Sequence, residues 1–310
     1  MNTYIALVKR EILDGKNGYF RVPLILAGLT VALVLLGVTG VGELNFVNEI
    51  DDHRVRNLGE ALELAQQEEG EELPAAVTAG YWGLSILTWF ALPGVVFFSL
   101  LSSLYEERRD RSILFWKSMP IDDWQEVAVK LFAPVVAAPL IFLSIVIAAQ
   151  LTIALLLSVA VLFQGGPVLE LWPVGLMITG WFSVASHYLI WALWALPVLA
   201  WVLFVSAYAS RLPFMWAILT PVVIIIAEGM FFETHEFARW LGIQLGGWQD
   251  FAFYNFGHDI DGPKDVLALV FGKAQWQAFT YTITSSRFWL GLVVAAGFIY
   301  GSIELRKRAS

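Results

Sequence analysis

Long apolar runs constrain this chain more than any other feature of its sequence. Six stretches consist almost entirely of apolar residues: 22–41, 79–104, 127–163, 182–208, 214–232 and 288–303. Several exceed the roughly 18 apolar residues that are typical of a membrane-spanning helix. The chain is 58% hydrophobic, whereas soluble domains are nearer about 45–50%. We therefore predict an all-α, polytopic membrane protein, a single domain over residues 1–310 with six transmembrane helices.

The lysine and arginine residues predict how these spans are oriented. If both termini are cytoplasmic, 13 of the 19 basic residues fall on the cytoplasmic side, mainly in residues 9–21, 108–117 and 306–308. Cytoplasmic loops carry the excess of basic residues in membrane proteins. No cleavage site for a signal peptide stands out, so we expect the first span to serve as its own insertion signal.

Four segments outside the spans have their own patterns. Residues 1–21 place apolar side chains at helical spacing, which favours an interfacial helix on the cytoplasmic leaflet. Residues 43–78 form an acidic external loop, in which 57–72 could be a short helix or partly disordered. Residues 233–287 are rich in aromatic rings and predict a helical cap outside the membrane, between spans five and six. Residues 164–181 could be a re-entrant or interfacial segment.

The densest polar segment lies between the second and third spans, at residues 105–120 within the cytoplasmic segment 105–126. Its pattern predicts a short helix that Pro120 ends, followed by an N-cap at Asp122 or Asp123 and a return to the membrane. Mixed charges beside aromatic residues are typical of protein–protein contacts. The candidate docking residues are Glu106, Glu107, Arg108, Arg109, Asp110, Arg111, Ile113, Phe115, Trp116, Lys117 and Pro120.

The run from Leu104 to Pro120 closely resembles the loop between spans two and three of ABC-2-type transporter permeases. The likeness lies in the Glu/Arg-rich start, the Ser-Ile-Leu step, the aromatic residues before Lys117, and Pro120. The resemblance implies a coupling helix that docks in a cleft of a separate ABC ATPase subunit. It implies a complex of two such ATPases and two permease copies, a homodimer or heterodimer, surrounded by lipids of a bacterial inner membrane. ATP and Mg²⁺ would bind in the ATPase, and the complex would act as an exporter.

The chain itself contains no G-x-x-x-x-G-K-[ST] phosphate loop. We therefore expect a transport subunit without a cofactor of its own, not an enzyme. No basic tract points to nucleic acid. Two alternatives remain open at this stage: an ion-coupled carrier or channel, and a membrane-embedded enzyme whose site lies in the cap at 233–286.

Polar residues within the spans are the candidates for a substrate path. Ser99, Ser102, Gln150 and Glu228 could line it, although serine and glutamine can equally join helices by hydrogen bonds, and Glu228 could close its span at the interface. No metal site is expected, because the chain has no cysteine and the segment His235–Arg239 lacks the second histidine of a zinc-protease motif.

Overall fold

The protein is helical throughout the part that its computed structural model describes, which is residues 3–39, 57–117, 121–256 and 273–308. No strand occurs in these ranges, so the all-α prediction is confirmed. Six helical stretches within them are long and apolar enough to cross a membrane: 17–39, 73–109, 123–164, 168–194, 213–231 and 286–308. The prediction of a multi-pass membrane protein is therefore confirmed.

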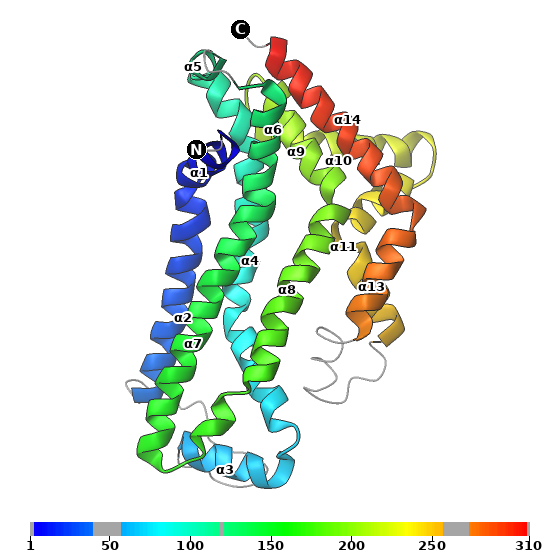
Figure 1. Ribbon diagram of the computed structural model, residues 1–310. Helices are drawn as coiled ribbons and strands as arrows, with labels where there is room; N and C mark the ends of the chain where they lie inside the picture. Colours follow the sequence, from blue (N-terminus) through cyan, green and yellow to red (C-terminus); the bar gives the residue numbers. More distant parts are fainter. Residues whose placement is uncertain (1–2, 40–56, 118–120, 257–272, 309–310) are drawn as a thin grey trace.

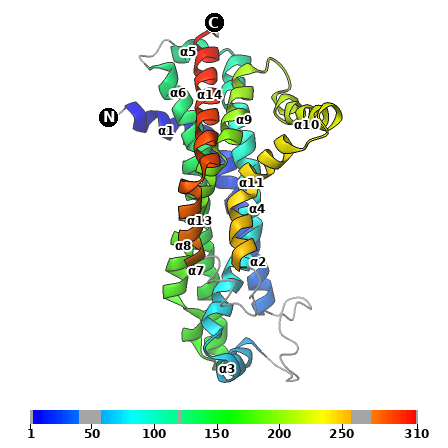
Figure 2. The same cartoon turned by 90° about the vertical axis from the view of Figure 1, so that its right-hand side faces the viewer.

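Four long helices run side by side along the molecule (Figure 1). They are α2 (Val22–Thr39), α4 (Leu73–Arg109), α7 (Ala138–Gln164) and α8 (Val174–Trp194). At one end lie α1 (Thr3–Asp14), the short α5 (Ile113–Lys117) and the last turns of α14 (Ser286–Arg308). We call this the α5 end. The opposite end carries α3 (Leu58–Glu69), as Figures 1 and 2 both show.

The core lies where α4, α9 (Leu196–Tyr208) and α14 meet near the α5 end. Leu100, Val127, Phe142 and Leu203 are fully buried there. Gly301 brings α14 close to α9, since a Cβ at this position would lie 2.8 Å from the ring of Phe204. This packing fixes the end of α4, from which the polar segment continues.

Two π-helical segments join consecutive helices without a break. Asn17–Arg21 links α1 to α2, and Ala133–Ala137 links α6 (Asp123–Phe132) to α7. Pro134 has no N–H to donate, and a widened turn accommodates such a residue within a continuing helix. The third span therefore stays helical from 123 to 164, as its length predicted.

The fourth span differs from its predicted bounds. It consists of α8 and α9, which are separated at Ala195, directly before the helix break expected at Pro197. Because α8 already begins at Val174, residues 174–181 belong to this span and not to a separate re-entrant segment. A short 3₁₀ turn at Val168–Leu171 precedes it.

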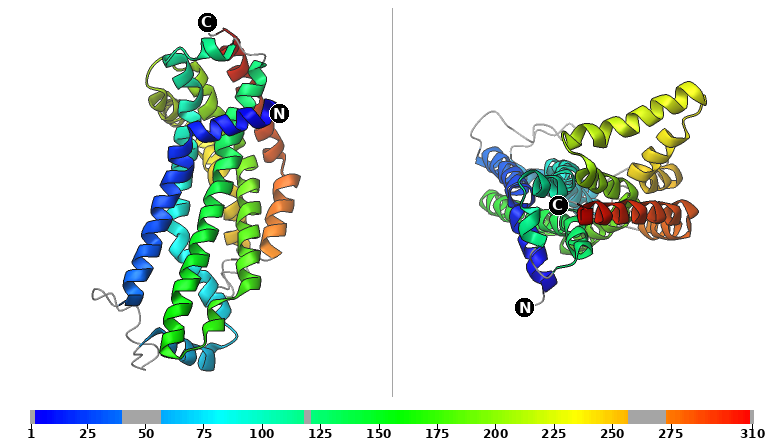
Figure 3. Two further views of the ribbon diagram at one scale, coloured as in Figure 1. Left: turned by 60° about the vertical axis from the view of Figure 1, so that its left-hand side comes forward. Right: turned by 90° about the horizontal axis from the view of Figure 1, so that it is seen from above.

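The region after the fourth span also departs from expectation. Helix α10 (Pro213–Phe231) projects away from the bundle in the view from above (Figure 3), and Ala217 is its one buried residue. Helices α11 (Glu236–Phe256) and α13 (Lys273–Thr284) lie alongside α8 rather than beyond its end (Figure 1). The indoles of Trp191 and Trp194 donate to carbonyls of α11 at 2.7 and 2.6 Å. The external cap is therefore not confirmed, and residues 257–272 of it lie outside the described part.

The two predicted helices outside the spans both form. Helix α1 lies across the start of the bundle, steeply inclined to α2 (Figure 3), with Tyr4, Ile5 and Leu13 exposed. Helix α3 is capped by Asn57, whose side chain accepts from the N–H of Glu60 at 2.9 Å. The preceding part of the acidic loop, to residue 56, lies outside the described residues.

Candidate docking site

The segment that links α4 to α6 begins with a sharp reversal after α4. Arg111 has φ 55°, in the left-handed region that side chains other than glycine rarely occupy. This turn folds α5 back over the end of α4, and the carbonyl of Ser112 accepts from the N–H of Phe115 at 3.0 Å. The short helix therefore stands at the extreme end of the molecule (Figure 1).

Part of the predicted docking set is exposed there. The side chains of Glu106, Arg109, Asp110, Arg111, Phe115 and Lys117 are exposed. Leu114 and Phe115 are 56% and 58% exposed, so the tip of α5 carries an apolar patch among charges. Arg109 binds Asp110 at 2.9 Å, and this hydrogen bond lowers the pKa of the Asp110 carboxyl. Pro120 lies outside the described part of the chain.

Ile113 and Trp116 hold α5 in place instead of facing outward. Ile113 is buried. The ring of Trp116 is covered by the guanidinium of Arg10 from α1, whose Cζ lies 4.0 Å from the ring centroid. Cation–π contacts of this kind stabilise by about 0.5–2 kcal/mol. Lys117 also donates to the carbonyl of Lys307 at 3.1 Å, so α5 contacts both α1 and α14.

Glu107 is the central residue of a buried charge cluster that the sequence analysis did not predict. Its carboxylate binds Lys130 of α6 at 3.0 Å and Arg306 of α14 at 2.5 Å. All three residues are buried, at 8%, 3% and 4% exposure. A buried charge is tolerated only when it is paired and hydrogen-bonded. The end of α4 is therefore tied to two helices that are distant in sequence.

The cluster continues to α1 and to the first turn of α6. Lys130 also binds Glu11 at 3.2 Å, and Arg306 lies 3.1 Å from Asp123. Arg10 pairs with the buried Glu126. Burial alone would lower the pKa of Arg10, but the hydrogen bond and charge of Glu126 outweigh it and raise that pKa. The cluster thus joins α1, α4, α6 and α14 at the base of α5.

Arg108 has a structural role in the same region. Its guanidinium donates to the carbonyls of Ser206 and Ala209 at 2.7 Å each, at the end of α9. A cation there satisfies carbonyls that have no partner within the helix and lies at the negative end of the helix dipole. The hydroxyl of Ser206 accepts in turn from the backbone of Leu104 and Tyr105. Arg108 therefore joins α4 to α9.

The predicted docking residues accordingly divide into two groups. One group is exposed around α5, and the other, Glu107, Arg108, Ile113 and Trp116, anchors it. The sequence analysis missed Lys130 and Arg306 as partners of Glu107, and Glu11 as the second partner of Lys130. A usable signal exists for Lys130, which lies inside a predicted apolar run and so requires an acidic partner.

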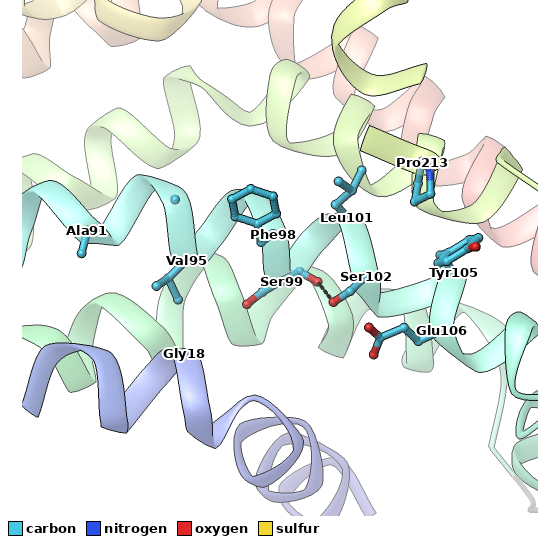
Figure 4. Close-up of a pocket in the computed structure, with 11 residues that line it drawn as sticks. Gly18, Ala91, Val95, Phe98, Ser99, Leu101, Ser102, Tyr105, Glu106 and Pro213 are labelled. Carbon is cyan, nitrogen blue, oxygen red and sulfur yellow. Dashed lines mark hydrogen bonds between the residues drawn. The ribbon is translucent and has the colours of Figure 1, made fainter. Parts of the chain in front are cut away.

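The candidate path residues do not come together. Ser99 and Ser102 line an open groove of about 650 Å³ on α4, beside Pro213 (Figure 4). Gln150 is fully buried elsewhere, where it donates to Ser85 at 3.0 Å and accepts from Trp181 at 2.7 Å. It therefore joins α7 to α4 and α8 by hydrogen bonds, which is the alternative to a place in a substrate path.

Glu228 also has a structural partner set. Its carboxylate accepts from Thr234 at 2.8 Å and from the backbone N–H groups of Glu236 and Phe237 at 2.8 and 2.9 Å. These are the free N–H groups of the first turn of α11, which an acidic side chain stabilises. Glu228 therefore fixes the turn between α10 and α11 and does not line the groove.

No protein-family profile, curated protein or solved structure matches this chain. In the part of the chain that the structure describes, no group of three or more His, Asp or Glu side chains could hold a metal ion.

Proposed function

We propose that this chain is the membrane subunit of an ATP-driven transporter of the ABC-2 permease type, and that a separate ATPase subunit docks on α5. The observation that carries the proposal is an exposed apolar and charged surface on α5, next to a buried cluster of ion pairs. Leu114 and Phe115 are exposed at the tip of α5, among Arg109, Asp110 and Arg111. Apolar anchors inside a charged rim are the usual composition of a specific protein interface.

The charge cluster at the base of α5 explains how a partner that binds α5 could move the membrane helices. The base of α5 is held by the Glu107 cluster, which joins α1, α4, α6 and α14 through buried ion pairs. Arg10 contacts Trp116 of α5 and pairs with the buried Glu126, so a displacement of α5 would act on this cluster. Such a displacement must move these helices or break buried charge pairs, which is costly.

The distribution of charge supports a cytoplasmic location for this surface. The α5 end carries 13 of the 19 basic residues when the termini are placed in the cytoplasm. The chain has no phosphate loop of its own, so an ATP-driven role requires a partner. Export from a bacterial cell, by two copies of this chain with two ATPases, is the complete form of the proposal.

Co-purification from native membranes tests it. We expect a phosphate-loop ATPase to purify with the wild-type chain in near-equal amount and to hydrolyse ATP. Arg109→Glu combined with Arg111→Glu should remove most of it, and Phe115→Ala should weaken it about tenfold or more, as truncation of a central anchor does.

Matched variants elsewhere serve as controls. Arg287→Glu reverses an exposed charge on α14, and Phe163→Ala removes an exposed ring, 86% exposed, at the end of α7. Both should retain the ATPase. If the purified chain transports alone in liposomes under an ion gradient, with no ATPase present, the chain is a carrier and the proposal fails.

A further inference from the structure

An open groove runs along one face of α4. Its floor is α4 from Ala91 to Glu106, and it is bounded by Gly18 of the segment before α2 and by Pro213 at the start of α10 (Figure 4). At 1.5 Å per residue this floor is about 22 Å long. With a volume of about 650 Å³, the groove falls within the range of small-molecule sites, roughly 300–1,000 Å³.

The groove changes in chemistry along its length. Toward the α3 end it is lined by Ala91, Gly94, Val95 and Phe98. The ring of Phe98 is stacked on Phe214 at 6.2 Å, and both rings stay about half exposed. These residues offer an elongated apolar surface rather than a flat patch.

The other half of the groove is polar. Ser99 and Ser102 lie on the side of α4 that faces Gly18, and Glu106 follows on the same side (Figure 4). The hydroxyl of Ser102 donates to the carbonyl of Ser99 at 3.3 Å, which leaves its lone pairs available to a ligand. Ser99 shares a hydrogen bond with the buried Tyr19.

Glu106 supplies a negative charge at the α5 end of the groove. Throughout the described ranges it forms no ion pair, whereas the next carboxylate, Glu107, binds two buried cations. The nearby Arg109 is paired with Asp110 at 2.9 Å, so that guanidinium is already compensated. Tyr105 also lines the groove, and the guanidinium of Arg109 lies over its ring, 5.9 Å from the centroid.

We propose that this groove binds an amphipathic cation, with its charged head at Glu106 and its apolar body along Ala91–Phe98. The long apolar floor selects a chain or an extended ring system. The single uncompensated carboxylate selects a positive head over a neutral or negative one. The ligand would reach the groove laterally from the membrane, since α4 is open to its surroundings on this face. That such a ligand is transported cargo rests on the proposed function, but its binding does not.

Binding of a cationic amphiphile to the purified chain tests the proposal without any ATPase. The chain is placed in phosphatidylcholine nanodiscs, and empty nanodiscs are subtracted. Dodecyltrimethylammonium is compared by equilibrium dialysis with dodecyldimethylamine oxide, which has the same chain and a head without net charge. We expect one saturable site per chain, about tenfold tighter for the cation.

Two variants separate the two halves of the groove. Gly94 has no heavy atom within 4 Å of an added Cβ, so Gly94→Leu can place a side chain in the apolar half. It should weaken binding of both amphiphiles at least tenfold. Glu106→Gln should weaken only the cation, to the level of the amine oxide. Gly83→Leu, at an equally open position of α4, and Glu63→Gln, on α3, are the matched controls and should bind as the wild type does.

Each result of the binding experiment either supports or overturns the proposed site. Unsaturable partitioning, equal affinity for the two amphiphiles, or unchanged binding by Gly94→Leu would overturn the proposal. A phospholipid that co-purifies with the wild type, is lost in Gly94→Leu and is not displaced by the cation would identify a resident lipid instead, and would also overturn it. If Gly94→Leu folds poorly, Gly94→Ala gives the same comparison with a smaller plug. Loss of the ATPase partner would leave these results untouched, so the two proposals fail separately.

Discussion

Replacing Glu107 by glutamine should destabilise the protein far more than the same change at its neighbour Glu106. Glutamine keeps the volume of the side chain but removes its charge. The Glu107 carboxylate binds two buried cations, Lys130 at 3.0 Å and Arg306 at 2.5 Å. Glu106 is exposed and forms no ion pair with any residue in the described ranges. The two adjacent positions therefore test burial and pairing with sequence context held constant.

The expected cost follows from what remains after the substitution. Removing one partner of a buried ion pair typically costs about 3–5 kcal/mol. Here Lys130 retains Glu11 at 3.2 Å, and Arg306 retains Asp123 at 3.1 Å. Because neither cation is left alone, we expect a cost at or just below the lower end of that range, about 2–3 kcal/mol in the free energy of unfolding. For Glu106→Gln we expect less than about 0.5 kcal/mol, as for surface changes generally.

Thermal unfolding followed by tryptophan fluorescence measures the difference, since the chain contains 14 tryptophan residues. Glu107→Gln should lower the midpoint by roughly 5 °C, and Glu106→Gln by about 1 °C or less. Combining Glu107→Gln with Lys130→Met should cost less than the sum of the single changes, by about 1 kcal/mol or more. Equal midpoints for the two glutamine variants would refute the central role of Glu107 in the cluster. Strict additivity of Glu107→Gln and Lys130→Met would refute it as well.

Three further substitutions probe other contacts by the same thermal measurement. Gln150→Leu leaves the indole N–H of Trp181 without its acceptor at 2.7 Å and should cost about 1–3 kcal/mol, whereas adding Trp181→Phe should recover part of the loss. Arg111→Gly relieves a left-handed residue at φ 55° and should stabilise by up to about 1 kcal/mol, so a loss of stability would contradict the role of that turn. Gly301→Ala brings a Cβ to 2.8 Å from a ring of α9 and should lower the midpoint, unlike Gly297→Ala, which meets nothing within 4 Å.

The spans and the short helices could be predicted because they depend on local pattern. Apolar runs located five of the six candidate spans to within six residues at each end, whereas the fourth was expected at 182–208 and its candidate span is 168–194. The helix formers in residues 57–72 favoured a short helix there, one of the two alternatives left open, and α3 forms in that segment. The burial of Glu107 also had a local signal, since it continues the buried stripe Val96, Leu100 and Leu104 at spacings of three and four. Glu107 lies on this buried face of α4, and the prediction that it faces a partner protein did not take its helical position into account.

Pairings across long stretches of sequence could not be predicted. Glu107 and Arg306 are 199 positions apart, and nothing in either neighbourhood identifies the other. The position of α11 and α13 was missed for a similar reason. Their aromatic and polar composition fits a cap, but the carbonyls of Ile243 and Leu245 accept from the indoles of Trp194 and Trp191, which fixes α11 against the end of α8.

Arg108 should matter for stability and Arg109 for partner binding. Substitutions at these two neighbouring residues therefore test the division of the segment into anchoring and contact residues. Arg108 donates to two carbonyls at the end of α9 at 2.7 Å each. Arg109 is exposed, pairs with its neighbour Asp110 at 2.9 Å, and lies over the ring of Tyr105, 5.9 Å from its centroid. Arg108→Gln should therefore destabilise by about 2 kcal/mol, as loss of charged hydrogen bonds at a helix end does. Arg109→Gln should leave the unfolding midpoint almost unchanged.

The opposite order is expected for partner binding. At a temperature well below both midpoints, Arg109→Gln should reduce the amount of co-purified ATPase, and Arg108→Gln should retain most of it, because the Arg108 guanidinium faces α9 and not the surface of α5. If both variants lose the partner in proportion to their loss of stability, α5 contributes to binding only by being folded. If neither loses it while the paired reversal at Arg109 and Arg111 does, the contact depends on the summed charge of the rim and not on one arginine.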